Sequence, residues 1–130
     1  MRLRVSGRMQ RKNLRVDKRL LGTWKSDRGK TFRHFVPWAG LKGRRLDRFK
    51  AIFGKLKLTY DRKKIRHELG EYEHSSPYKV LARDADSVAI LTEDLVTGGQ
   101  KIWHIHFDGD YYWIAFGHKR QVTEYFRRIK

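Results

Sequence analysis

The chain has 130 residues, of which 39% are hydrophobic, and it contains 31 Lys and Arg against 14 Asp and Glu, with no cysteine. This length favours one domain with a single core, and the absence of cysteine excludes disulfides and thiolate metal sites. No apolar run approaches the roughly 20 residues of a membrane-spanning helix, and residues 1–20 lack the apolar centre of a signal peptide. We therefore expect a cytoplasmic protein, because a chain without disulfides fits a reducing compartment.

The formal net charge of +17 is distributed unevenly along the chain. Residues 1–20 contain eight basic residues and one acidic residue, and residues 25–66 contain fifteen basic and three acidic residues. Residues 67–118 instead contain nine acidic and three basic residues. The positive charge is therefore expected on an N-terminal arm and on the segment that follows the first strand.

Residues 1–19 form the expected arm. They show no sustained helical or alternating period, and their density of like charge favours a solvated, disordered segment. Such an arm would contact phosphates, or it would be an extension without a role of its own. We expect its deletion to leave the fold of residues 20–130 intact.

The folded domain begins at Leu20-Leu21-Gly22-Thr23-Trp24-Lys25. A glycine allows a strand to bend, and a large aromatic residue two positions later can close the end of a barrel. These six residues predict the first strand of a small closed β-barrel.

A helical insertion is expected over about residues 28–53. The first stretch has three apolar residues at helical spacing, namely Phe32, Phe35 and Val36. Ser26 and Asp27 precede it as possible caps, and Pro37 would end it. A second stretch is amphipathic, with one apolar side: Leu46, Phe49, Ile52 and Phe53.

From Gly54 onward, short alternating segments are separated by turn residues every eight to twelve positions. The expected strands cover residues 55–60, 64–70, 78–83, 87–93, 100–107, 111–117 and 121–128. Ser75-Ser76-Pro77 is expected to separate two of them. With the first strand, this predicts an all-β fold, a meander barrel of about eight antiparallel strands.

The hairpin of residues 100–117 turns at Asp108-Gly109-Asp110, a sequence typical of a tight two-residue turn. Alternation then separates two faces. The first is ordinary core material: Trp103, Ile105, Phe107, Tyr112, Ile114 and Phe116. The second mixes apolar bulk with imidazole and hydroxyl groups: Ile102, His104, His106, Tyr111, Trp113 and Ala115.

The Gly22-Thr23-Trp24 strand, the antiparallel meander and a terminal Arg127 or Arg128 resemble the calycin superfamily, which includes lipocalins and fatty-acid-binding proteins. The resemblance implies that Trp24 packs across the barrel end against Arg127 or Arg128, with Gly22 beside it. It covers residues 20–130 and is strongest to small lipocalin-like bacterial proteins of unassigned function. The helical insertion is similar to the lid of fatty-acid-binding proteins. The Arg-x-Tyr carboxylate clamp of those proteins is missing near the C-terminus, so their fatty-acid site is not carried over.

Three histidines are candidates for the barrel interior. His67 shares the apolar face of its strand, and His104 and His106 project side by side from another. Three imidazoles would suit a zinc ion, but buried histidines more commonly hydrogen-bond neighbouring groups within a polar-lined cavity. The alternation equally permits His104 and His106 on the outer surface. We expect no metal and no cofactor.

Two functions from different classes remain open. In the first, the barrel binds a small, partly apolar ligand without catalysis, beneath a basic helical lid. The side chains expected to supply its polar contacts are His67, His104, His106, Tyr111 and Trp113. No catalytic triad or glycine-rich phosphate loop supports an enzyme.

In the second, the barrel is a scaffold for nucleic acid or another anionic surface, which would be bound by the arm and by basic residues of the insertion. The residues expected to contact phosphates are Arg44, Arg45, Arg48 and Lys50. Steep loss of affinity with salt would distinguish this function from binding inside the barrel.

Overall fold

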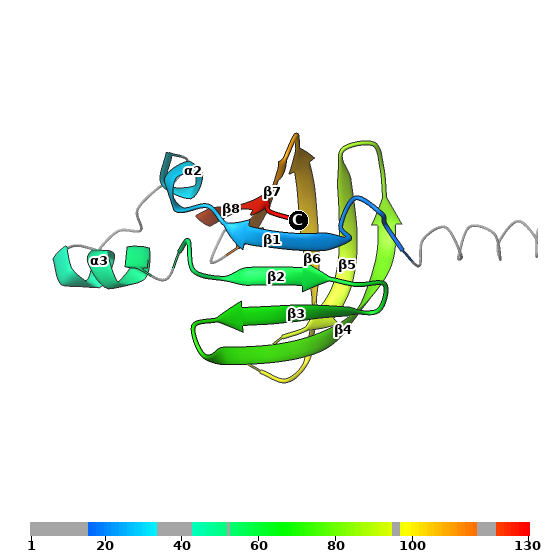
Figure 1. Ribbon diagram of the computed structural model, residues 1–130, viewed down its shortest axis with the longest axis horizontal. Coiled ribbons are helices and arrows are strands. Elements are labelled where there is room, and N and C mark those ends of the chain that lie inside the picture. Colours follow the sequence, from blue (N-terminus) through cyan, green and yellow to red (C-terminus); the bar gives the residue numbers. More distant parts are fainter. Residues whose placement is uncertain (1–15, 34–42, 52, 95–96, 117–121) are drawn as a thin grey trace, which may run out of the picture.

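The computed structural model describes residues 16–33, 43–51, 53–94, 97–116 and 122–130. Eight antiparallel strands form a closed barrel in which each strand pairs with the next along the chain and β8 pairs with β1 (Figure 1). The prediction of an eight-stranded antiparallel meander barrel is confirmed. No helix in these ranges is long and apolar enough to cross a membrane.

The strands are β1 (Gly22–Ser26), β2 (Lys57–Tyr60), β3 (Lys64–Leu69), β4 (Tyr72–Arg83), β5 (Ser87–Glu93), β6 (Gln100–Asp108), β7 (Tyr111–Phe116) and β8 (Val122–Arg128). Two helices lie between β1 and β2, namely α2 (Arg28–Arg33) and α3 (Gly43–Ala51). The predicted helical insertion is therefore present, at the end of the barrel where β1 finishes (Figure 1).

Asp27, one of the two residues expected to cap the first helix, does cap α2. Its Oδ1 accepts the Lys30 N–H at 2.8 Å, and its backbone carbonyl accepts the Thr31 N–H at 3.0 Å. This pattern satisfies donors that the first turn of a helix otherwise leaves unpaired. Ser26, the other expected cap, instead ends β1 and has a different role described below.

The longest strand, β4, departs from the sequence-based expectation. Ser75-Ser76-Pro77 does not separate two strands but lies within β4, where Ser76 pairs with Ile65 and Pro77 with Lys64. The turn occurs earlier, at Gly70, whose φ of 61° suits glycine. Ser76 is fully buried, so this polar stretch forms part of the barrel wall and its central side chain points into the barrel.

The aromatic hairpin follows the expectation closely. Asp108 pairs with Tyr111, which leaves a two-residue turn in which Gly109 has a φ of 60°. Ile105 and Tyr112 are fully buried. Trp103, Phe107 and Ile114 pack against the same core cluster. The side of the hairpin expected to be core is therefore the inner one.

Residues 16–19, which we expected to belong to a disordered arm, are part of the fold. Asp17 is 1% exposed, and Leu20 has no exposed surface. The Leu20 N–H donates to the Asp17 carbonyl at 3.0 Å, which closes a turn just before β1. The predicted boundary at residue 20 therefore lies too late, and the remainder of the predicted arm, residues 1–15, lies outside the described residues.

Candidate ligand-binding site

The two ends of the barrel differ, and one of them is sealed by Trp24. Trp24 is 1% exposed, and its indole N–H donates to the Leu20 carbonyl at 2.9 Å. The Arg128 guanidinium lies over the indole, 4.3 Å from the ring centroid. Of the two arginines that the calycin resemblance offered, Arg128 makes this contact, whereas Arg127 is exposed on the outer face of β8.

Gly22 allows the chain to close at this end. Its φ of 120° is rarely adopted by other residues, and a Cβ atom there would collide with the backbone oxygen of Lys130. The next residue, Thr23, donates its N–H to the same oxygen at 3.2 Å. The start of β1 and the residues after β8 therefore share one tightly packed corner, where a side chain on residue 22 has no room.

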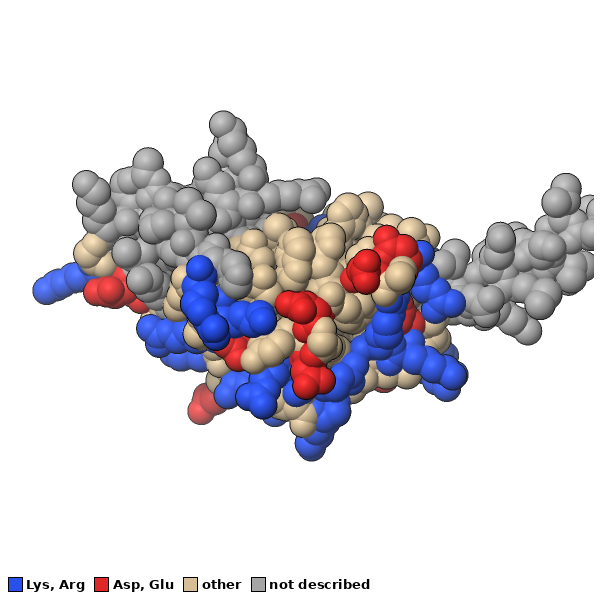
Figure 2. Space-filling view, turned by 90° about the horizontal axis from the view of Figure 1, so that it is seen from above, with Lys and Arg blue, Asp and Glu red and all other residues tan. Residues whose placement is uncertain are grey.

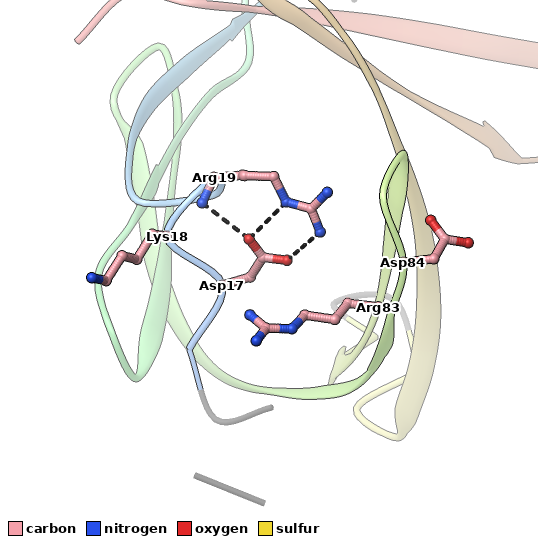
Figure 3. Close-up of a pocket in the computed structure, with 5 residues that line it drawn as sticks. All are labelled: Asp17, Lys18, Arg19, Arg83 and Asp84. Atoms are coloured by element: carbon pink, nitrogen blue, oxygen red, sulfur yellow. Dashed lines mark hydrogen bonds and ion pairs between the residues drawn. The ribbon is translucent and has the colours of Figure 1, made fainter. Parts of the chain in front are cut away.

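The turn before β1 completes the seal and borders a surface hollow of about 400 Å³ (Figure 3). Arg19 donates to both carboxylate oxygens of Asp17, at 3.0 and 2.7 Å, and to the carbonyl of Ala85 at 2.9 Å. Burial alone would raise the pKa of Asp17, but the hydrogen bonds from Arg19 outweigh it and leave the pKa below its ordinary value. Asp17 and Arg19, two of the five charged residues that line the hollow, are paired with each other, and their hydrogen bonds hold the turn against the barrel.

Aromatic side chains fill the half of the barrel above this seal. The Tyr60 and Tyr112 hydroxyls are hydrogen-bonded at 2.7 Å, and Tyr112 packs on Trp24 and Phe126 with ring centroids 4.6 and 5.0 Å apart. Burial raises the pKa of both tyrosines. Both hydroxyls are therefore un-ionised at neutral pH, and this half of the interior is occupied by protein.

We call the opposite end of the barrel the mouth. There β1, β3, β5 and β7 finish, and β2, β4, β6 and β8 begin. Three inward-facing apolar side chains near it pack against the core but keep part of their surface exposed: Leu56, Trp103 and Ile114. In the sealed half, by contrast, Trp24, Leu58, Ile65 and Tyr112 are 0 to 1% exposed. Phe107, next to the β6–β7 turn at the sealed end, is also partly exposed, but the Arg19 guanidinium lies over its ring, 4.5 Å from the centroid. Among these inward-facing residues, the mouth therefore has three partly exposed apolar side chains and the sealed end has one.

A carboxyl group, Glu124, lies beside this apolar surface. Glu124 pairs with Ile114 across β7 and β8, and Phe126, two residues along, is a core residue, so alternation directs Glu124 inward. Its Oε2 accepts the Ser26 hydroxyl at 2.6 Å. Burial raises the pKa of Glu124 to about 7, against the opposing effect of the Ser26 hydrogen bond.

Ser26 connects this carboxyl group to the helical insertion. While its hydroxyl donates to Glu124, its Oγ accepts the N–H of Gly54 at 3.0 Å. Gly54 follows α3, and the neighbouring Phe53 is 3% exposed and meets Phe32 of α2 edge to face, with centroids 5.6 Å apart. The segment after α3 is therefore held directly at the mouth.

Two buried polar atoms on β3 and β4 have no hydrogen-bond partner among the described residues: Nδ1 of His67 and Oγ of Ser76. His67 is 4% exposed and meets Trp103 edge to face, with centroids 6.0 Å apart. Burial lowers the pKa of His67, so its imidazole is neutral at pH 7. Unpaired buried polar atoms are uncommon in folded proteins, and a bound molecule or an ordered water commonly explains them.

Further titratable groups lie at the rim of the mouth. His74 Nε2 and Glu93 Oε1 are 3.0 Å apart. Lys101, exposed at the start of β6, has its Nζ 5.5 Å from the centre of the Trp103 ring. The mouth therefore combines apolar surface with one inward carboxyl group, one neutral imidazole and a lysine at its edge.

The structure does not bring the predicted ligand-binding residues together. His67 faces inward, but His104, His106, Tyr111 and Trp113 lie on the outer face of the hairpin, where His106 stacks on Trp113 with centroids 3.9 Å apart. The physical reason is the pleat: Ile105 and Tyr112 are buried, so their immediate neighbours along each strand point outward. His104 and His106 instead border a surface hollow of about 200 Å³ between β4, β5 and β6.

No group of three metal-ligating side chains forms within the described part of the chain. The three histidines considered as zinc ligands are split between the inside and the outside of the barrel wall, since Leu58 and His67 pair on the inner face while His104 is exposed. A three-histidine metal site is therefore not assembled.

The basic residues expected to contact phosphates are only partly described. Arg44 and Arg48 are exposed on α3, whereas the side chains of Arg45 and Lys50 lie outside what the structure describes. A further basic region lies on the outer wall of the barrel. There Lys25 of β1 is the cross-strand neighbour of Lys57 on one side and of Arg127 on the other.

No protein-family model, curated protein or solved structure matches this chain. The eight-stranded closed barrel is compatible with a calycin-like fold, and the stacking of Arg128 on Trp24 is the contact that the calycin resemblance implied.

Sequence reasoning missed Glu124 and the true role of Ser26. Alternation with Phe126 in the last strand was the available signal for an inward Glu124, but a single carboxyl group in a basic segment is ordinarily solvent-exposed. Ser26 stands directly before a helical stretch, which made it a candidate cap. Its pairing with Glu124, 98 residues away, is set by barrel closure.

Proposed function

We propose that the barrel binds a small, partly apolar molecule in its mouth half and does so without catalysis. The observation that carries this proposal is the partly exposed, inward-facing apolar surface of Leu56, Trp103 and Ile114 beside the inward carboxyl group of Glu124. Ligand sites are typically concave and apolar, with a few polar groups that fix orientation. The calycin-like barrel and its sealed end support the same proposal.

The sealed end limits the size of the ligand. The sealed half of the interior is filled by three aromatic side chains: Trp24, Tyr60 and Tyr112. A ligand that enters from the mouth would therefore reach no deeper than the fully buried Ile90 and Ile105. His67, whose ring meets Trp103 edge to face, would offer its unpaired Nδ1 to such a ligand, whereas Ser76 pairs with Ile65 in the sealed half. We therefore propose a compact ligand or a short chain.

The helical insertion would act as a basic lid. Its α2 lies against β8, where the Thr31 hydroxyl accepts the Tyr125 N–H at 3.0 Å, and the segment after α3 is fastened to Ser26. Arg44 and Arg48 keep the exposed side of α3 positive. A ligand would then pass between the lid and the strand ends.

Fluorescence of N-phenyl-1-naphthylamine, a neutral apolar probe, tests this proposal. We expect the probe to bind with increased emission, and we expect Ile114→Trp, which fills the mouth, to weaken its binding at least tenfold. Ala115→Trp adds the same side chain on the outer face and is the matched control. Equal probe binding by both variants, with unchanged circular dichroism, would overturn the proposal, as would failure of the parent protein to bind the probe. Native mass spectrometry of the purified protein would identify any retained ligand.

A second function, binding of nucleic acid by the outer wall, has one specific observation in its favour. Lys25 lies directly between Lys57 and Arg127 on adjacent strands, although like charges that face each other across a sheet destabilise it. Figure 2 shows Lys and Arg side chains along the lower edge of the molecule in that view, with Asp and Glu side chains between them. Lys57 is already paired with Glu68, with its Nζ 3.9 Å from Oε2. Bound phosphates would therefore chiefly relieve the repulsion between Lys25 and Arg127.

Fluorescence anisotropy with a single-stranded oligonucleotide at several salt concentrations tests this second function. We expect affinity to fall steeply with salt, and we expect the Lys25→Glu and Arg127→Glu double variant to reduce affinity at least tenfold. Lys79→Glu and Arg83→Glu reverse two exposed charges on β4 and serve as the control. Affinity that is independent of salt, or equal losses in both double variants, would exclude this surface.

A further inference from the structure

We infer that the ligand carries a protonated amine, and that the Glu124 carboxylate at the mouth is the group that pairs with it. This inference rests on the proposed ligand-binding function and names the chemical class of the ligand. It starts from the position of Glu124, which faces inward from β8 next to Ile114, at the level where apolar surface remains accessible.

The hydrogen bonds around Glu124 leave acceptor capacity unused. Ser26 donates to Oε2 and accepts from Gly54, so the hydroxyl is fully engaged and fixes the carboxyl group in one orientation. Across the described residues, Glu124 has no other hydrogen bond and no ion-pair partner. An ionised carboxylate can accept about four hydrogen bonds, so Oε1 in particular remains open to a donor from a ligand.

Among the described residues, Glu124 has no paired positive charge. Removing a carboxylate from water without a counter-charge is costly, and proteins normally compensate with a paired cation or with protonation. None of the Lys and Arg side chains that the structure describes lies within ion-pair distance of Glu124. An alkylammonium ligand would supply both the charge and the hydrogen-bond donors, while its apolar part would lie against Leu56, Trp103 and Ile114.

The other titratable groups that the structure describes at the mouth favour an amine over an acid. His67 is buried and neutral, and His74 is paired with Glu93. Lys101 is exposed at the rim with its Nζ near the Trp103 ring, so its charge is largely solvated. A carboxylate ligand placed against Ile114 would face Glu124 directly, which is a repulsive contact.

Competition among three eight-carbon compounds tests this inference: octylamine, 1-octanol and octanoate, each displacing N-phenyl-1-naphthylamine from the full chain at pH 8. We expect octylamine to displace the probe at a concentration at least tenfold lower than the other two. Glu124→Gln should remove this preference, so that octylamine and 1-octanol displace the probe at concentrations within about twofold of each other. Glu73→Gln, an exposed carboxyl group on β4, is the matched control and should change nothing.

A second measurement does not depend on a variant. Because protonated Glu124 cannot pair with an ammonium group, the affinity for octylamine should fall at least fivefold between pH 8 and pH 5.5, whereas the affinity for 1-octanol should not. Equal displacement by all three compounds, a preference for octanoate, or an amine preference that Glu124→Gln retains would each overturn the inference while leaving the ligand-binding function standing. Absence of probe binding would overturn both.

Discussion

The Arg128 guanidinium lies 4.3 Å above the Trp24 ring and, from the same side chain, donates hydrogen bonds to the carbonyls of Arg19, Leu21 and Lys130. One planar cation thus joins the turn before β1, the first strand and the residues after β8. A stacked arginine that also uses its fork of donors is not equivalent to a lysine.

Arg128→Lys should therefore destabilise the fold although it keeps the charge. We expect the free energy of unfolding to decrease by about 1–3 kcal/mol, the usual magnitude for losing charged hydrogen bonds together with a cation–π contact. Denaturation by urea monitored by tryptophan fluorescence measures this change. Arg127→Lys, on the exposed face of the same strand, should change the free energy by less than about 0.5 kcal/mol. Equal effects at both positions would show that the stacking has no special role.

The buried pair of Tyr60 and Tyr112 predicts non-additive effects. Tyr60→Phe or Tyr112→Phe alone leaves one buried hydroxyl without its partner, at a cost of about 1–3 kcal/mol in the free energy of unfolding. The double variant removes both hydroxyls and should be more stable than the sum of the single effects predicts. A double-mutant cycle by chemical denaturation measures the coupling. Strict additivity would mean that the 2.7 Å hydrogen bond does not contribute to stability.

The raised pKa of Glu124 predicts a specific dependence of stability on pH. The carboxyl group has an ordinary pKa of 4.5 in the unfolded chain and about 7 in the folded barrel, so between these values the folded state binds more protons. The contribution of Glu124 to the free energy of unfolding should therefore be most favourable below pH 4.5 and should fall as the pH rises to about 7.

Glu124→Gln removes that contribution. The difference in unfolding free energy between the parent and Glu124→Gln should decrease from pH 4.5 to pH 7 and level off above it. His67 has a lowered pKa and acts in the opposite direction, but it is present in both proteins and cancels in the difference. A difference that does not vary with pH would contradict an inward, desolvated Glu124.

Truncation tests the assignment of residues 16–19 to the fold. A chain that begins at residue 16 retains the bonds between Asp17 and Arg19 and the contact of the Arg19 guanidinium with Phe107, 4.5 Å from its ring centroid. A chain that begins at residue 20 loses these contacts, and we expect its free energy of unfolding to decrease by about 1–2 kcal/mol. In a domain of this size, such a decrease lowers the thermal midpoint by several degrees. Equal thermal midpoints for the two chains would show that residues 16–19 do not stabilise the fold and belong to the arm.

Local sequence patterns predicted most of the barrel. Strand alternation located β2, β3 and β5 to β8 to within a few residues, and Asp108-Gly109-Asp110 located the turn of the aromatic hairpin. These features depend on neighbours in the chain, since turn chemistry and period-two alternation are local signals. The exception was Ser75-Ser76-Pro77, where polar, turn-forming residues are held in β4 by pairing with β3.

The candidate site was predictable only in part, because it depends on contacts between distant segments. His67 was expected inside from the alternation of its own strand, and it is inside. The orientation of His104 and His106 required knowing which face of the hairpin meets the core, which is decided by Trp24 packing on Tyr112 across the barrel. The pairing of Ser26 with Glu124 likewise joins the two ends of the domain.

The hydrogen bond from Thr23 to the Lys130 carbonyl has a practical consequence for experiments on surfaces. It holds the last described residue at the sealed end, and the described chain starts at the same end, where the Val16 carbonyl accepts a bond from Arg83. A tag attached after Lys130 would therefore leave the molecule on the side away from the mouth. Immobilised through such a tag, the barrel would present its open end to solution, so small molecules could be screened without the support obstructing their entry.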